Sequence, residues 1–249
     1  MRPLSSRNEL LAVVGPGDVF ARFAVPEQPH RAWAQGRAVG YLRESHSGKA
    51  NLTAWGPAPD LADLLDGLAD AGELSPALDH VTVPREHAAL LTGRHLTTGG
   101  DGWDWFATDV IPPRTSAEDR LVELDDQADA AELTALADRE NPLSEGYPGT
   151  GRSERWVGVR DEGRIVACAA LHRLSSGTAH LSGIIVAATH RGQGLGRAMT
   201  AALTRDVLAH EPVSTLGMYA GNDVARALYT SLGYVADKRW HSCALLPSG

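Results

Sequence analysis

The sequence has only two cysteines, no basic stripe and no long apolar run. Cys168 and Cys243 are too few for a disulfide framework or a cysteine-based metal site. Both lie in apolar, strand-like segments, which predicts buried thiols in a reducing compartment. The missing basic stripe and the net charge of -8 argue against a nucleic-acid partner and mildly favour small cationic substrates.

The chain also lacks the hydrophobic segments that membrane or secreted proteins carry. Its first ten residues, MRPLSSRNEL, contain no apolar signal core, and no apolar run is long enough to span a membrane. We therefore expect a cytoplasmic protein without a membrane partner and without a bound metal.

The composition is that of a folded protein. With 249 residues, 43% hydrophobic and 22% charged, the chain can bury a core as one large domain or two small ones. The proline-containing segment Ile111-Pro112-Pro113-Arg114-Thr115-Ser116 is the best boundary signal. It predicts an N-terminal α+β domain at residues 1–113 and a second domain at 118–249.

The most informative stretch runs from His180 to Ala209. Residues 181–186 are apolar and β-branched, which predicts a buried strand. A glycine-rich turn, residues 191–196, follows, and then apolar residues recur at helical spacing up to Val207. A helix entered through glycines exposes free backbone N–H groups at its positive end, so this stretch predicts a phosphate site that needs no lysine.

The turn itself excludes two common nucleotide motifs. It lacks the G-x-x-x-x-G-K-[ST] pattern of a P-loop, and Arg197 stands where G-x-G-x-x-G requires its third glycine. It does match [RQ]-x-x-G-x-[GA] through Arg191, Gly194 and Gly196. A plain turn between strand and helix is the alternative for the hexapeptide alone, and the neighbouring elements argue against it.

The second half of the chain alternates strands and helices around this turn. Strands are predicted at 121–124, 154–160, 164–173, 181–186, 214–219, 234–236 and 239–246. Helices are predicted at 128–139, from Leu195 to Val207 and at 223–232, with Gly233 ending the last one. Residues 141–152, rich in proline, glycine and serine, are predicted to form a loop or a broken helix.

This order and two motifs resemble the GNAT superfamily of N-acetyltransferases. The first motif is the turn at Arg191 to Gly196. The second is the closing pattern formed by Asn222, Ala225, Leu228, Tyr229, Leu232, Gly233 and Tyr234. The resemblance covers about residues 121–246 and implies an α+β fold with a central mixed β-sheet flanked by helices.

The resemblance implies direct transfer of an acetyl group from acetyl-CoA to an amine. Backbone N–H groups would hold the pyrophosphate at Arg191, Gly192, Gln193, Gly194, Leu195, Gly196 and Arg197. The pantetheine arm would lie along Ile184, Ile185 and Val186, whose backbone donors would also polarise the thioester carbonyl. Asn222 would add a side-chain hydrogen bond. Tyr229 would protonate the leaving thiolate, or else serve only as a half-buried core aromatic.

The general base is left open by the sequence. Several GNAT members use a glutamate about eleven residues before the loop arginine, and this position holds His180. Histidine titrates near neutral pH and suits the role. Glu145, His172 and ordered water are the alternatives, as is a His180 without a catalytic role.

The acceptor site is expected at residues 141–152 and the neighbouring strand ends. Glu145, Tyr147 and Trp156 are candidate lining residues, although Glu145 also fits a solvated loop position. The partner would be a small-molecule or peptide amine, which the sequence does not name. The oligomeric state is left open.

The first half of the chain resembles a degenerate repeat of the second. Strands are predicted at 19–25, 31–35, 38–43, 51–55, 81–83 and 103–107, with helices at 60–71, capped by Asp60, and at 86–91. Gly56-Pro57-Ala58-Pro59 replaces the glycine turn, and its prolines remove backbone donors. Tandem acyltransferases similar to the glycine N-acyltransferase and mycothiol synthase families have one such half; the alternative is an unrelated α+β domain.

Two functions from other classes fit the sequence less well than catalysis. A non-catalytic acyl-CoA-binding regulatory module would not need both Tyr229 and Asn222. A structural or partner-binding protein would not need three alternating glycines in the turn from Arg191 to Gly196. We therefore expect an acetyl-CoA-dependent N-acetyltransferase.

Overall fold

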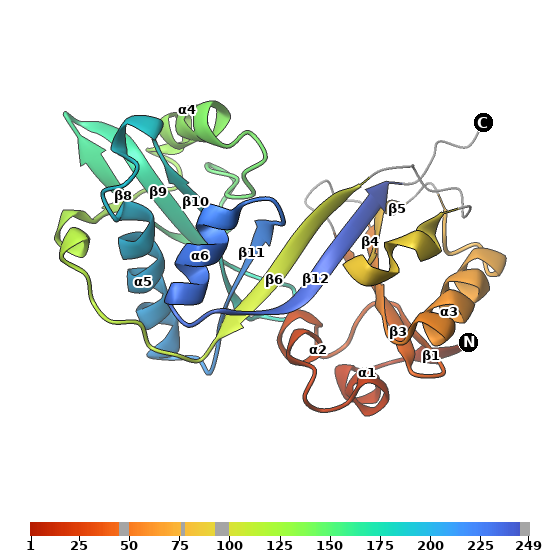
Figure 1. The fold of residues 1–249 in the computed structure, drawn as a ribbon. Helices are drawn as coiled ribbons and strands as arrows, with labels where there is room; N and C mark the ends of the chain where they lie inside the picture. The colour runs from red at the N-terminus through yellow and green to blue at the C-terminus, as the bar shows by residue number, and fades with distance from the viewer. Residues whose placement is uncertain (45–49, 76–77, 93–99, 245–249) are drawn as a thin grey trace. The chain divides into compact units, whose positions relative to one another are not determined.

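The chain divides into two compact units (Figure 1). The computed structural model describes residues 1–44, 50–75, 78–92 and 100–244. Unit 1 comprises Met1–Trp105, Met218–Gly221 and Ala236–Gly249, and unit 2 comprises Phe106–Gly217 and Asn222–Val235. None of the helices in the described ranges combines the length and the apolar surface needed to cross a membrane.

Unit 1 contains a mixed sheet with strand order β1-β2-β3-β4-β5-β12. The strands are β1 (Arg2–Leu4), β2 (Ala32–Gln35), β3 (Ala38–Glu44), β4 (Ala50–Trp55), β5 (Leu78–Pro84) and β12 (Val235–Ala244). β4 and β5 are parallel and the other neighbours are antiparallel. The helices are α1 (Arg7–Val14), α2 (Val19–Ala24) and α3 (Ala58–Asp70), followed by the 3-10 helix η1 (Arg85–Leu91).

The core of unit 1 is built on α3. Leu61, Leu64, Leu65 and Leu68 are fully buried on one face of this helix, as their spacing predicts. They pack with Leu52, Val81 and Val83 of the sheet. Strand β6 (Asp101–Thr108) has residues in both units.

Three local predictions for unit 1 are wrong. The predicted strand at 19–25 is instead helix α2 (Val19–Ala24), which the Asp18 carboxylate caps by accepting from the Ala21 N–H at 2.8 Å. Asp60 does not cap α3: the N-cap is Pro57, and the Asp60 carboxylate accepts from the Arg37 N–H instead.

The third error concerns the end of the chain. One continuous strand, β12, replaces the two strands predicted at 234–236 and 239–246. Residues 245 and 246 of the second prediction lie outside the described residues.

Unit 2 contains the mixed sheet predicted for the second half, in the order β11-β10-β9-β8-β7. The strands are β7 (Val122–Leu124), β8 (Ser153–Asp161), β9 (Arg164–Arg173), β10 (Ala179–Val186) and β11 (Ser214–Tyr219). β10 and β11 are parallel, and the other pairs are antiparallel. The helices are α4 (Ala130–Glu140), α5 (Leu195–Leu208) and α6 (Asp223–Ser231), with 3-10 helices η2 (Ser116–Arg120) and η3 (Ala188–His190).

The two units share one arrangement of elements. In unit 1, β2, β3 and β4 pair antiparallel, and α3 connects β4 to the parallel strand β5. In unit 2, β8, β9 and β10 pair antiparallel, and α5 connects β10 to the parallel strand β11. This correspondence is what a repeat of one ancestral unit would produce.

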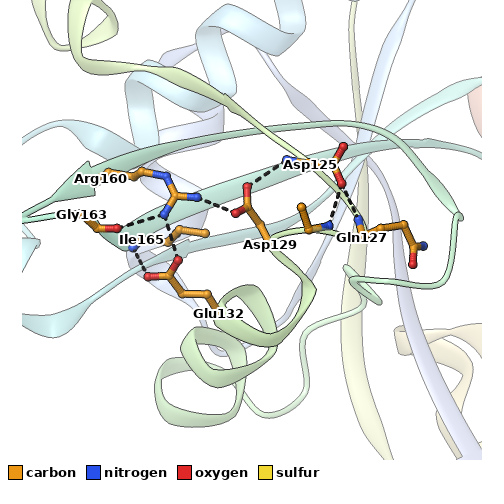
Figure 2. Close-up of polar contacts among 8 residues, drawn as sticks. Asp125, Gln127, Asp129, Glu132, Arg160, Gly163 and Ile165 are labelled. Atoms are coloured by element: carbon orange, nitrogen blue, oxygen red, sulfur yellow. Dashed lines mark hydrogen bonds and ion pairs between the residues drawn. The ribbon is translucent and has the colours of Figure 1, made fainter.

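Arg160 fixes helix α4 to the hairpin of β8 and β9 (Figure 2). Its guanidinium donates to Asp129 at 2.6 Å, to Glu132 at 2.9 Å and to the Gly163 carbonyl at 3.1 Å. The second carboxylate oxygen of Glu132 accepts from the Ile165 N–H at 2.6 Å. The start of α4, strand β8 and the turn before β9 are therefore held together by one charged cluster around Arg160.

A second carboxylate orders the entry to α4 (Figure 2). Asp125 accepts from the N–H groups of Ala128 and Gln127, at 2.7 and 2.9 Å. These two bonds, that of Ala128 first, hold the pKa of the Asp125 carboxyl below its ordinary value. The Asp125 N–H donates to the Asp129 carboxylate, which also accepts from Arg160, so the turn is linked to the charged cluster around Arg160.

We predict that Gly158→Ala destabilises unit 2. A Cβ at Gly158 would overlap the Ala167 carbonyl oxygen and the Leu124 side chain, so strands β7 to β9 would have to shift. Overpacking of this kind costs about 1–3 kcal/mol of unfolding free energy, measurable by urea unfolding. Gly17→Ala is the control, because Gly17 has no positive φ and nothing lies within 4 Å of an added Cβ. Equal losses in both variants would contradict the steric explanation.

Candidate functional site

The candidate site begins at a bulge in the middle of β10. The register with β9 shifts between Ser182 and Ile185, and Gly183 has a φ of 59°. In the described part of the chain, the register with β11 is confined to His180↔Thr215 and Leu181↔Leu216. The residues predicted to hold the pantetheine arm, Ile184, Ile185 and Val186, therefore lie just beyond the point where β10 and β11 stop pairing.

Cys168 supports the bulge from strand β9. Its thiol is buried, as predicted for both cysteines, and donates to the Gly183 carbonyl at 3.6 Å. Burial raises the pKa of this thiol to about 12, so it stays protonated at neutral pH. Cys168 therefore has a structural role, as a hydrogen-bond donor under the bulge.

The glycine-rich turn leads directly into α5. Gly192 and Gly194 have φ values of 78° and 75°, and Gly194 is the N-cap of α5 in the left-handed conformation. Since its N-cap is a glycine, α5 has no N-cap side chain to accept from its first N–H groups. The first-turn N–H groups of a helix have no partner within it, so this end is suited to bind an anion such as a phosphate.

Two residues fix the start of α5 against its surroundings. Leu195 is buried in the core. A Cβ at Gly196 would lie 3.5 Å from Leu228 of α6 and 3.7 Å from Val186 of β10, which are ordinary contacts. The helix start, the end of β10 and α6 are therefore close neighbours.

The polar side chains of the turn and of the start of α5 anchor it to four other elements. Arg191 donates to Glu140 at the end of α4 (2.8 Å) and to the Val186 carbonyl (3.2 Å). Gln193 accepts from Arg120 at 2.9 Å, and Arg197 donates to Ser231 of α6. These side chains hold the loop in place, and its backbone carries the candidate binding surface.

Glu140 is a site residue that the sequence reasoning missed. Its carboxylate accepts from Arg191 and from the Ala188 N–H at 3.1 Å. The Ala188 bond is the main cause that holds the pKa of Glu140 below its ordinary value, with Arg139 and Arg191 acting in the same direction. No local pattern marks this residue, because its partners lie about fifty positions away in the sequence.

Helix α6 carries the two predicted residues of the closing motif. Asn222 is its N-cap, and its side-chain oxygen accepts from the Ala225 N–H at 3.0 Å. The amide nitrogen of Asn222 is therefore the part suited to bind a ligand. Gly233 follows the helix with a φ of 91°, as predicted for its end.

Tyr229 is buried on the inner face of α6. Its ring contacts Phe106 and Tyr234 edge-on, with centroids 6.2 Å apart in each case. Burial, and next the neighbouring Tyr234, raises the pKa of its hydroxyl above the ordinary value. Tyr229 therefore keeps its proton at neutral pH, as a proton donor must.

The two candidate histidines lie opposite each other on β9 and β10. His172 pairs with His180 in the register, and their rings are 5.2 Å apart. His180 is half-buried, with Nδ1 2.9 Å from the Thr215 hydroxyl. His172 is buried, and contacts Arg152 through Nε2 (3.2 Å) and Ser182 through Nδ1 (3.0 Å).

The loop at 141–152 supplies the other predicted residues. Tyr147 has a φ of 48°, and the Arg152 guanidinium lies 5.1 Å from its ring centre. Burial, and next the charge of Glu145, raises the pKa of the Tyr147 hydroxyl. Glu145 is exposed. Trp156 is buried beneath this loop and donates to Asp126 at 2.8 Å, so it supports the loop from below.

The described residues contain no group of three or more side chains arranged to hold a metal ion. The candidate ligand-binding features of the site are the start of α5, the end of β10, the buried Tyr229 and the two histidines.

Comparison with known proteins identifies the domain. Residues 119–234 match the model of the acetyltransferase (GNAT) family, and this range contains the bulge, the glycine turn and Tyr229. Residues 119–234 therefore form a GNAT acetyltransferase domain. No curated protein sequence matches the chain significantly.

Solved structures extend the similarity beyond this domain. A GNAT-family protein from Novosphingobium aromaticivorans is 26% identical, with a TM-score of 0.55 over 79% of this chain and 84% of that chain. A GCN5-related N-acetyltransferase from Kribbella flavida is 20% identical, with a TM-score of 0.55 over 89% of this chain and 91% of that chain. A Drosophila protein is 16% identical, with a TM-score of 0.63 over 99% of each chain. The last two likenesses show the fold.

We predict that Glu140→Gln destabilises unit 2 in a pH-dependent way. The folded-state pKa of Glu140 is below its ordinary value of 4.5, so its interactions stabilise the fold above that pH and are lost as the pH falls through the folded-state pKa. The variant should lose up to about 1 kcal/mol of unfolding free energy at neutral pH, since Arg191 is partly exposed.

Urea unfolding at a series of pH values measures this difference. The difference between wild type and Glu140→Gln should vanish toward low pH, and Arg191→Gln should add little to Glu140→Gln at neutral pH. A loss that is the same at every pH would contradict the electrostatic origin.

Proposed function

We propose that the GNAT domain transfers an acetyl group from acetyl-CoA to a primary amine of a small molecule or a peptide. The observation that carries the proposal is the start of α5, where Gly194 in the left-handed conformation takes the place of a capping side chain. This helix start follows the bulged end of β10, so a phosphate site and an unpaired strand edge adjoin each other.

The residues around this point fit the parts of acetyl-CoA. Backbone N–H groups between Arg191 and Arg197 would hold the pyrophosphate. The backbone of Ile184 to Val186 would accept the pantetheine arm and polarise the thioester carbonyl. The Asn222 amide nitrogen would add a donor, since its oxygen already caps α6.

The acceptor must reach the thioester as a neutral amine, so a base is needed. His180 is the candidate that the geometry favours. His172 is buried, whereas His180 is half-buried and therefore more accessible to a substrate. Glu145 is exposed to solvent. A half-buried imidazole at a strand end is accessible to substrate, and imidazole is the most frequent general base in enzymes.

The proposed reaction is a direct attack. The amine nitrogen forms a bond to the thioester carbonyl carbon, and the carbon–sulfur bond breaks as the carbonyl re-forms. Two protons leave the nitrogen of the original ammonium group. His180 takes the first and passes it to solvent. The thiolate takes a proton from the Tyr229 hydroxyl. The second proton released by the amine nitrogen then returns to the Tyr229 oxygen.

The experiment that tests the proposal is release of free thiol from acetyl-CoA over a panel of small amines, amino acids, aminoglycosides and peptides. Turnover with one class would support the transfer and identify the acceptor class. Tight acetyl-CoA binding with no turnover across the panel would favour a non-catalytic acyl-CoA-binding module instead.

We predict that Gly196→Glu weakens acetyl-CoA binding more than about 10-fold, or more than ~1.4 kcal/mol. The new carboxylate would lie in the first turn of α5, where it suits the helix dipole but repels a pyrophosphate. Its Cβ has space, so the protein should stay folded. Gly196→Gln is the neutral control of the same size. Equal affinity of the two variants in titration calorimetry would rule out this phosphate site.

We predict that Tyr229→Phe lowers kcat roughly 100-fold while KM for acetyl-CoA changes little, because the phenol acts on the leaving group. Tyr234→Phe is the matched control. Tyr234 is an equally buried tyrosine whose hydroxyl lies 2.8 Å from Thr204 and 2.7 Å from Ser214, so its loss should affect stability and leave kcat nearly unchanged. A wild-type kcat in Tyr229→Phe would exclude it as the acid.

A further inference from the structure

A row of polar side chains crosses three strands of unit 2. His172 on β9 is opposite His180 on β10, and His180 is opposite Thr215 on β11. Residues directly opposite each other in a sheet project from the same face, and Ser182 follows His180 on that face at a spacing of two. We call His172, His180, Ser182 and Thr215 the polar row.

The Thr215 hydroxyl donates its proton to a backbone carbonyl oxygen. Thr215 Oγ1 lies 2.7 Å from the Ala179 carbonyl oxygen, which can only accept. A hydroxyl has one proton, so the contact between Thr215 Oγ1 and His180 Nδ1 at 2.9 Å requires the imidazole to donate. Neutral His180 therefore carries its proton on Nδ1 and its lone pair on Nε2.

We infer that Thr215 is a positioning residue, which holds His180 in the tautomer and the orientation that a base acting through Nε2 requires. The inference rests on the base role of His180 in the proposed function. A base with its proton on the wrong nitrogen cannot accept another there, so an orienting partner can control the rate without touching substrate.

The tautomer of His172 can be worked out from its contacts in the same way, but its Nε2 faces a donor. Arg152 has only donors, so its 3.2 Å contact makes His172 Nε2 an acceptor, and Nδ1–H must donate to Ser182 Oγ at 3.0 Å. His172 is therefore also an Nδ1–H tautomer, but its lone pair is used by Arg152. The two histidines differ in what meets Nδ1, which is Ser182 for His172 and Thr215 for His180.

The first test reads the tautomer in the ligand-free protein. Two-bond 1H–15N correlation spectra at about pH 8.5, where an ordinary histidine is neutral, show which ring nitrogen carries the proton. His180 is assigned by the signal missing in His180→Gln. We expect an Nδ1–H pattern for His180 in the wild type and in Thr215→Ser, and its loss in Thr215→Val. His172 should keep its pattern in all three proteins.

The second test measures turnover. Thr215→Val should lower kcat roughly 10- to 100-fold, the effect of one hydrogen bond to a charged group, with KM for acetyl-CoA unchanged. Thr215→Ser keeps the hydroxyl and should restore most of kcat. A merely structural role of Thr215 would move stability without changing the tautomer signal.

The two tests separate the possible failures. An Nε2–H pattern in wild-type His180, or an unchanged pattern in Thr215→Val, would overturn the inference. If the tautomer changes in Thr215→Val but His180→Gln keeps the wild-type kcat, Thr215 does set the tautomer and the base role in the proposed function fails.

Discussion

The candidate site depends on the close approach of two glycines over one tryptophan ring. A Cβ at Gly183 would lie 3.2 Å from the Gly146 Cα and 3.4 Å from the Trp156 ring, and a Cβ at Gly146 would lie 2.6 Å from that ring. Side chains here would push the loop at 141–152 away from β10. The approach lets β10 bulge at Gly183, and the bulge ends the pairing with β11 where a ligand is expected to bind.

Protonation states in this site are set by neighbours more than by net charge. Burial raises the pKa of Tyr229 and keeps its proton in place. Thr215 and Arg152 each allow only one tautomer of the histidine that they contact. Fixed donors and acceptors of this kind need no rearrangement during a reaction, and such preorganisation is an effective form of catalysis.

The features predicted well from sequence are those encoded within a few residues. The strand, turn and helix from residue 181 to 207 follow from hydrophobic period and glycine spacing, and the family model confirms the domain they indicated. Helix α2 was mistaken for a strand because its six residues are too few for a clear period, and the Asp18 cap decided its form.

Contacts between distant residues could not be predicted in this way. Glu140 meets Arg191 across about fifty positions, and Thr215 meets His180 across thirty-five. Nothing in either local pattern marks the partner, because the pairing depends on the register of a sheet that sequence alone does not give. The burial of His172 and the partial exposure of His180 likewise follow from the packing of the sheet, which is why the sequence left the base open.

The two units contain crossover helices that are packed alike but begin differently. Helices α3 and α5 each connect a strand to its parallel neighbour and bury an apolar face. Helix α5 starts after Gly194 and has no proline in its first turn, whereas α3 starts after Pro57 and has Pro59 in its first turn, and proline has no N–H to offer.

A carboxylate is a second difference between the start of α3 and the start of α5. Asp60 lies in its first turn and accepts from the Arg37 N–H at 2.9 Å, so negative charge already occupies the positive end of the helix. A phosphate at α3 would meet fewer donors and a repelling charge. Pro57, Pro59 and Asp60 therefore make the start of α3 unsuited to a phosphate, while Leu61 and Leu64 keep the helix packed.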